Sequence, residues 1–147
     1  MKRLITTAAV LMALAACDTA GPSISSDFPA FYLQDITTAA VPTSCCFLGG
    51  NGDILAGAGT YVYFVDGQNG YVRAEMSLGV PVTHVAGSPD GGYGLAVSGQ
   101  VLYVISNDIY TIHSQIVLPG VGELLVPKPN STLVFVVCAD GGVAKVE

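Results

Sequence analysis

Residues 84–106 read HVAGSPDGGYGLAVSGQVLYVIS, and this stretch echoes an earlier one. Shifted back by forty positions, it falls without a gap on SCCFLGGNGDILAGAGTYVYFVD, residues 44–66. Gly59 then meets Gly99, and the apolar run YVYFV lies over VLYVI. Self-similarity at a period near forty residues is typical of a repeat architecture. The glycine-rich centre of the stretch is therefore interpreted first as part of a repeating unit.

The same register extends beyond this window. Residues 71–86 lie over 31–46 on one side and over 111–126 on the other, and both overlays keep the apolar pattern. Only after Ala139 does the register slip, by about two residues, so that the final VAKVE takes the place of VLYVI. We therefore expect about three copies of one structural unit.

Each unit consists of short runs rich in valine, isoleucine, leucine, tyrosine and phenylalanine, separated by glycine, proline, asparagine and aspartate. None of these runs has helical periodicity, so they predict strands. In the second unit the expected strands are 83–87, 93–98, 101–106 and 110–117. Four antiparallel strands in forty residues predict a blade of a β-propeller. The fold class is therefore all-β.

The stretch VTHVAGSPDGGYGLAVSGQVLYVIS, residues 82–106, resembles the YVTN-type propeller repeat of bacterial lactonase-like and surface-layer proteins. In that repeat an inner strand ends in Ser-Pro-Asp-Gly and outer strands follow. The resemblance covers residues 31–147 and implies four-stranded antiparallel β-propeller blades. The Trp-Asp pair of another propeller family is absent, because the chain has no tryptophan.

The number of strands raises a question about closure. The chain supplies a fourth-type strand at about 31–37, two full units, and three strands ending at Glu147, which is about three blades' worth of strands and an incomplete ring. Propellers have at least four blades. Three hypotheses stay open. A homodimer closes a six-bladed ring, each first strand finishing the partner's last blade; or downstream blades are missing from a truncated or split gene product; or the chain is an open arc.

The N-terminus has the pattern of an export signal. Lys2 and Arg3 precede an apolar run from Leu4 to Leu14, which is too short to span a membrane. We expect residues 1–16 to be a lipoprotein signal peptide.

The end of this segment, Leu14-Ala15-Ala16-Cys17, resembles the lipobox of bacterial lipoproteins. The resemblance implies that Cys17 is lipidated and that the signal is cut before it. Asp18 resembles the sorting mark that retains such proteins in the inner membrane. An ordinary signal peptide with a stray cysteine near its cleavage site is the alternative. The expected location is the cell envelope, on the periplasmic or extracellular face of a bacterial membrane.

Residues 17–30 are small, polar and proline-bearing, which predicts a flexible tether before the propeller segment, residues 31–147. Beyond the signal, three basic side chains face eleven acidic ones, a formal net charge of about −8. Such a charge disfavours nucleic acid and anionic lipid headgroups as partners. The lipid anchor at Cys17, not a basic patch, is expected to hold the protein on the membrane.

No cofactor, metal or catalytic site is predicted. Gly91, Gly92 and Gly94 match no phosphate-binding motif and are interpreted as a turn after Pro89. The sequence DGQNG at 66–70 lacks the further oxygen ligands of a calcium loop, so it is interpreted as a strand connection. Asn130 matches a glycosylation sequon but is expected in a turn.

The histidines and cysteines are interpreted as structural. His84 and His113 occupy different repeat positions and have no carboxylate or cysteine at ligand spacing. Cys45, Cys46 and Cys138 align with small or apolar residues, which predicts packing roles, although a redox role of the adjacent pair is the alternative.

The sequence predicts a membrane-anchored binding or scaffold module without catalytic activity, acting on a protein or a small ligand of unknown identity. Two alternatives remain: part of a lactonase-like propeller hydrolase, and a sugar-binding propeller, which the absence of tryptophan disfavours.

Overall fold

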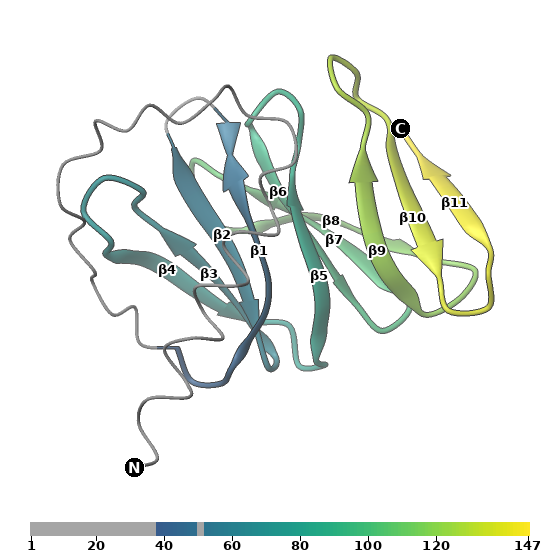
Figure 1. Cartoon of the computed structure of the whole chain (residues 1–147), viewed down its shortest axis with the longest axis horizontal. Coiled ribbons are helices and arrows are strands. Elements are labelled where there is room, and N and C mark those ends of the chain that lie inside the picture. The colour runs from purple at the N-terminus through teal and green to yellow at the C-terminus, as the bar shows by residue number, and fades with distance from the viewer. Residues whose placement is uncertain (1–37, 50–51) are drawn as a thin grey trace, which may run out of the picture. The chain divides into compact units, whose positions relative to one another are not determined.

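The computed structural model describes residues 38–49 and 52–147, and these residues form eleven strands in three antiparallel sheets (Figure 1). The first sheet has the order β1 (Pro42–Leu48), β2 (Asp53–Ala58), β3 (Tyr61–Val65), β4 (Val72–Ser77). The second has the order β5 (Val82–Gly87), β6 (Tyr93–Ser98), β7 (Val101–Ser106), β8 (Ile112–Val117). The third has three strands, β9 (Gly122–Pro127), β10 (Val134–Cys138) and β11 (Val143–Val146). The expectation of an all-β chain is confirmed.

The strands expected for the second unit agree with β5 to β8 to within two residues at every end. The expected strand at 31–37, the signal at 1–16 and the tether at 17–30, with Cys17 and Asp18, lie outside the described residues. Within 38–49 and 52–147, no helix is long and apolar enough to cross a bilayer.

The forty-residue period recurs in the backbone hydrogen bonds. The Val82 amide donates to the Gly59 carbonyl at 2.7 Å, and forty residues later the Gly122 amide donates to the Gly99 carbonyl at 2.9 Å. Three further hydrogen bonds, each from a backbone amide to a carbonyl, recur forty residues later. They are Leu78 to Thr60, repeated as Leu118 to Gln100; Asp66 to Tyr71, repeated as Ser106 to Thr111; and Gly70 to Asp66, repeated as Tyr110 to Ser106. The sequence repeat is therefore a repeat of backbone geometry.

The third sheet corrects one detail of the expected register. Ala96 pairs with Tyr103, whereas its counterpart Val136 pairs with Ala144, so the register slips by one residue and not by two. The reason is the hairpin: two residues join β6 to β7, whereas the Cys138 amide donates to the Gly142 carbonyl at 2.8 Å and closes a loop of three residues, 139–141, with Gly141 at φ 82°. Three-residue hairpin loops commonly need such a left-handed residue.

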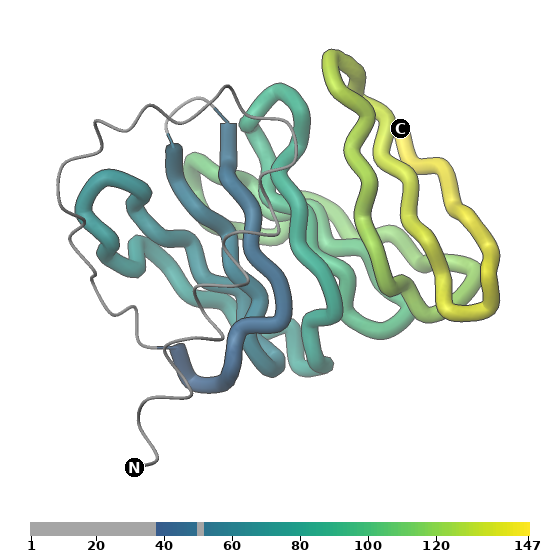
Figure 2. Tube along the Cα trace, viewed as in Figure 1, coloured from purple at the N-terminus to yellow at the C-terminus, as the bar shows by residue number. Residues whose placement is uncertain are grey.

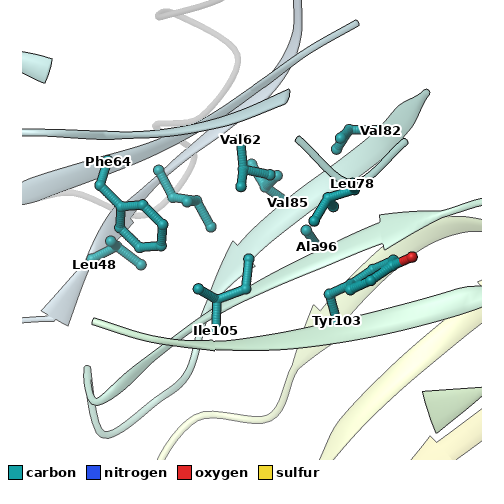
Figure 3. Close-up of a cluster of buried hydrophobic side chains, with 10 residues drawn as sticks. Leu48, Val62, Phe64, Leu78, Val82, Val85, Ala96, Tyr103 and Ile105 are labelled. Atoms are coloured by element: carbon teal, nitrogen blue, oxygen red, sulfur yellow. The ribbon is translucent and has the colours of Figure 1, made fainter. Parts of the chain in front are cut away.

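The sheets pack face to face through side chains that alternate along the strands. We call the face directed at the next sheet the forward face and the opposite one the rear face. At the first interface the forward face of the first sheet meets the rear face of the second (Figure 3). The side chains buried there include Leu55, Val62, Phe64, Val85, Ala96, Tyr103 and Ile105. At the second interface they include Leu95, Val97, Leu102, Leu125, Val134 and Val136.

The first strands of the three sheets, β1, β5 and β9, lie side by side, as the Cα tube in Figure 2 shows. β1 and β5 each carry a bulge, at Thr43 and Thr83. The Thr43 hydroxyl donates to the Val82 carbonyl at 2.9 Å, and the Thr83 hydroxyl donates to the Gly122 carbonyl at 2.8 Å. A bulge turns a side chain away from its regular direction in the strand. A threonine at the same repeat position therefore joins the first sheet to the second and the second sheet to the third.

A second polar contact accompanies each threonine. The Ser44 hydroxyl accepts the Val85 amide at 3.2 Å, and the Nδ1 atom of His84 accepts the Leu125 amide at 3.4 Å. Burial lowers the pKa of the His84 imidazole below its ordinary value. Since only an unprotonated Nδ1 can accept, the contact between the second and third sheets requires that nitrogen to be free of a proton.

Replacing Thr83 by valine should weaken the second interface. Valine keeps the branched shape but leaves the carbonyl of buried Gly122 without this donor, which costs about 1 kcal/mol of unfolding free energy. Urea denaturation should show this loss for Thr83→Val. The exposed turn residue Thr111, replaced by valine, is the control and should leave stability within about 0.5 kcal/mol. Equal stability of both variants would contradict the role of the hydroxyl.

Stability should also depend on pH through His84. Because its folded pKa is depressed, the unfolded chain binds more protons below the ordinary value of 6.5, so the unfolding free energy should fall as pH drops below about 6.5. His84→Ser reproduces the serine that the first interface carries at Ser44. The variant should lose this part of the pH dependence, measured by urea denaturation between pH 7.5 and 5. An unchanged slope would contradict the assignment.

Candidate binding pocket

A pocket of about 550 Å³ lies between the forward face of the second sheet and the rear face of the third. Its apolar walls are Leu95, Leu102, Val104, Ile116, Val134 and Val146. Its polar lining is contributed by Ser88, Asp90, Tyr93, His113, Ser114, Asn130, Ser131, Thr132 and Glu147. Two turns, β5–β6 and β9–β10, meet the outer strands β7, β8 and β11 around it.

The pocket exists because large side chains of the first interface are replaced by small ones at the second. Phe64 is buried at the first interface, and its counterpart forty residues later is Val104. Tyr103 is buried there as well, and Ala144 takes its place, because it pairs with Val136 as Tyr103 pairs with Ala96. Two aromatic rings of the first interface are therefore replaced at the second by an alanine and by a valine, and this valine, Val104, lines the pocket.

Tyr110 adds a further ring to the first interface. Its ring centroid lies 5.0 Å from that of Phe64. Tyr110 has φ 51°, the left-handed conformation that its counterpart Gly70 adopts without a side chain (φ 71°). That conformation costs a non-glycine residue about 1–2 kcal/mol. The ring contact offsets this cost.

An ion pair beside Phe64 fixes the edge of the first sheet. The guanidinium of Arg73 lies 2.7 Å from Asp66 and 3.4 Å from Asp53. Hydrogen bonding with the Tyr110 side chain, and then with Asp66, raises the pKa of Arg73 above its ordinary value. The first interface is thus filled by the aromatic rings of Phe64, Tyr103 and Tyr110, and the ion pair of Arg73 with Asp66 and Asp53 lies at the edge of the first sheet.

The turns at the pocket mouth also differ between the interfaces. At the first interface Gly49 and Gly91 approach so closely that a Cβ on Gly91 would lie 2.7 Å from the Gly49 Cα atom. Their counterparts forty residues later are Pro89 and Ser131, which line the pocket. Since both carry a Cβ atom, these two turns cannot approach as closely as the glycine turns do.

The rim of the pocket carries a fixed negative charge. The Ser88 hydroxyl donates to Asp90, and the Gly92 amide donates to the same Oδ1 atom at 3.1 Å. The bond from Ser88, followed by that from Gly92, lowers the pKa of Asp90 below its ordinary value, so the carboxylate is ionised at neutral pH. His113 also lines the pocket, and its ring centroid lies 5.2 Å from that of Tyr93. The rim therefore favours uncharged or cationic groups.

The glycine-rich centre forms a turn, as expected. Gly91 has φ 74°, and its amide donates to the Ser88 carbonyl at 2.9 Å. Asn130, expected in a turn, lies between β9 and β10 with φ 55°. Both turns also border the pocket, which their own sequences did not predict. The repeat itself contains the signal that could have predicted the pocket: Val104 stands at the position of Phe64, and Pro89 stands at the position of Gly49.

The segment at 66–70 connects β3 to β4, as expected. The Oδ1 atom of Asp66 accepts the amides of Gln68 and Asn69, at 2.8 and 2.9 Å. The bond from Asn69, followed by that from Gln68, lowers the pKa of Asp66. Its Oδ2 atom bonds Arg73, so the carboxylate closes the turn and pairs with a cation.

The structure separates the two histidines and gives each a neighbour. His84 joins two sheets, whereas His113 lines the pocket. Cys138 is buried on β10, while Cys45 and Cys46 are half-buried neighbours on β1. In the part of the chain that the structure describes, no three histidine, cysteine or acidic side chains gather as a metal site would require.

Comparison with known proteins adds similarity of fold. No family model matches the chain, and no curated protein matches it. Among solved structures, hydrazine synthase of Kuenenia stuttgartiensis is 19% identical with a TM-score of 0.62, over 74% of this chain and 33% of that one.

A functionally unknown protein from Desulfotomaculum acetoxidans is 16% identical with a TM-score of 0.61, over 76% and 42% of the two chains. A chain of a mitotic checkpoint complex is 15% identical with a TM-score of 0.56, over 82% and 43%. This chain thus spans less than half the length of these matches. At such low identity the likeness concerns the all-β fold alone.

Proposed function

We propose that the chain is a non-catalytic binding module of a bacterial cell-envelope lipoprotein, built of β-propeller blades and anchored through a lipid on Cys17. The lipobox-like Leu14-Ala15-Ala16-Cys17 and the resemblance of residues 82–106 to YVTN-type repeats support this assignment. Two complete four-stranded sheets at a forty-residue period agree with blades. Its ligand is a small molecule that enters the pocket between the second and third sheets.

The pocket is the observation that carries the proposal. Its volume of about 550 Å³ is within the range of small-molecule sites, roughly 300–1,000 Å³. Such sites combine mainly apolar walls with a few convergent polar groups. Here Leu102, Val104 and Val134 form walls, while Asp90 and Thr132 stand among the polar groups.

The distribution of polar groups selects a ligand class. The apolar walls favour a hydrocarbon or aromatic body, because burying it releases about 25 cal/mol per Å². The ionised Asp90, together with Glu147 and an acidic chain overall, disfavours an anion. We therefore assign to this pocket an amphipathic ligand whose polar end is uncharged or cationic.

Filling the pocket should abolish binding. The double variant Val104→Phe and Ala144→Tyr restores the aromatic side chains that the first interface carries at Phe64 and Tyr103. With the neutral fluorophore Nile red as probe, we expect the double variant to bind at least tenfold more weakly than the natural chain. Fluorescence titration gives the affinity, and circular dichroism checks that the β-sheet content is kept.

Val117→Phe is the matched control, because Val117 is 80% exposed and does not line the pocket. It should bind Nile red like the natural chain. Undiminished binding by the double variant would remove the pocket from the proposal.

Lipidation is tested separately. Cys17→Ser removes the thiol that accepts the diacylglycerol, so incorporation of radiolabelled palmitate should fall to background and the protein should leave the membrane fraction. Cys46→Ala is the control, since the repeat already carries alanine at Ala86. Undiminished labelling of Cys17→Ser would contradict the anchor.

A further inference from the structure

Among residues 38–49 and 52–147, the third sheet has an unpaired edge and an exposed apolar face. In the other two sheets β4 and β8 pair with the third strand, but no strand among the described residues pairs with the outer edge of β11. Leu124, Val126 and Val143 on the forward face are 42%, 44% and 62% exposed. An unpaired edge and an exposed apolar face both favour association.

The residues on the forward face of the third sheet correspond to residues that form an interface elsewhere in the repeat. Phe135 and Val137 on β10 are the counterparts of Leu95 and Val97, which are buried between the second and third sheets. Both pair on the same face with β9, Phe135 with Val126 and Val137 with Leu124. The forward face of the third sheet therefore continues a packing surface that the first and second sheets already use.

The sequence also contains a segment whose pattern matches the outer strands of the other two sheets. In the forty-residue register, residues 32–37 (YLQDIT) lie over β4 (VRAEMS) and β8 (IHSQIV). Ile36 falls at the position of Met76 and Ile116, both of which pack against the cores on forward faces. The segment lies outside the described residues, and its sequence is that of a fourth strand.

Residues 38–41, which follow this segment, contact the first sheet in the way that the linker at 78–81 contacts the second sheet. A Cβ on Gly59 would lie 3.0 Å from the Ala40 side chain, and a Cβ on Gly99 would lie 3.7 Å from that of Val80, forty residues later. The Ala39 amide also donates to the Tyr63 hydroxyl at 3.0 Å, on the rear face of the first sheet. Residues 38–41 thus hold the place that 78–81 hold between two sheets.

We propose that two copies of this chain exchange their N-terminal strands. Residues 32–37 of one copy pair with β11 of the other, and the first sheet then docks its rear face on the partner's third sheet. This exchange supplies both a fourth strand and a covering sheet. Within the chain, the fourth strand of one sheet leads directly into the next sheet, and that next sheet packs against the sheet to which the strand belongs.

The closing interface differs from the internal ones in two respects. Glu123 stands where Thr43 and Thr83 donate their interface bonds, and a carboxylate cannot donate. Tyr63 and Val65 on the rear face of the first sheet are buried already, so docking adds less newly buried apolar surface there than an exposed face would provide. Both features make this interface weaker than the internal ones, and the dimer should dissociate on dilution.

Light scattering on the lipidated full chain in mild detergent tests the proposal. We expect a dimer, and a monomer for either Ile36→Pro in the donated strand or Val143→Asp on the receiving face. The matched controls are Ser25→Pro, outside the segment 32–37, and Val117→Asp, at a valine on β8 that is 80% exposed against 62% for Val143. Both controls should remain dimers, and circular dichroism should show the same β-sheet content in all five proteins.

A mixture of the two interface variants separates exchange from simple destabilisation. Ile36→Pro keeps an intact receiving face, and Val143→Asp keeps an intact strand, so the mixture can form one correct interface per pair. We expect the mixture to associate at concentrations where each variant alone is monomeric. A monomeric natural chain, a trimer or larger assembly, a dimer that survives either variant, or a mixture that stays monomeric would overturn the proposal.

Discussion

Every sheet of this chain is apolar on both faces, and that constraint governs the rest of the structure. The second sheet places Ala96 and Tyr103 on one face and Leu95 and Leu102 on the other. A sheet of this kind must be covered on both sides, because apolar side chains left in water forfeit the burial that offsets the entropy of folding. The forty-residue repeat provides that cover by placing the next sheet against the forward face of the one before it.

The polar contacts show how the chain fixes the spacing of the sheets without a polar core. Thr43 and Thr83 reach from bulges on the innermost strands to carbonyls of the following strand. The companion contact tolerates different residues, since a serine hydroxyl serves at the first interface and a histidine nitrogen at the second. What the position requires is an acceptor for a neighbouring amide, and the choice of His84 makes the second interface sensitive to protons.

Much of the fold could be predicted from the sequence because strands and turns are local. Alternation and turn residues predicted β5 to β8 closely, and the offset of forty residues exposed the repeat. The slip before β11 was predicted wrongly, because the loop at 139–141 is one residue longer than its counterpart and its geometry depends on Gly141. The pocket was missed because Val104, which lines it, looks unremarkable until it is compared with Phe64, its counterpart at the first interface.

The pocket and the open edge share one strand, and this links the two proposals. Val146 and Glu147 line the pocket, while the outer edge of β11 is the one that a donated strand would join. Among the described residues β11 pairs with β10 alone, so fewer backbone hydrogen bonds hold it than hold a strand paired on both sides. Pairing on the second side would restrain β11 and reduce the entropy that a ligand must remove on binding. Because linkage is reciprocal, a ligand that orders β11 would strengthen the exchange of strands to the same degree.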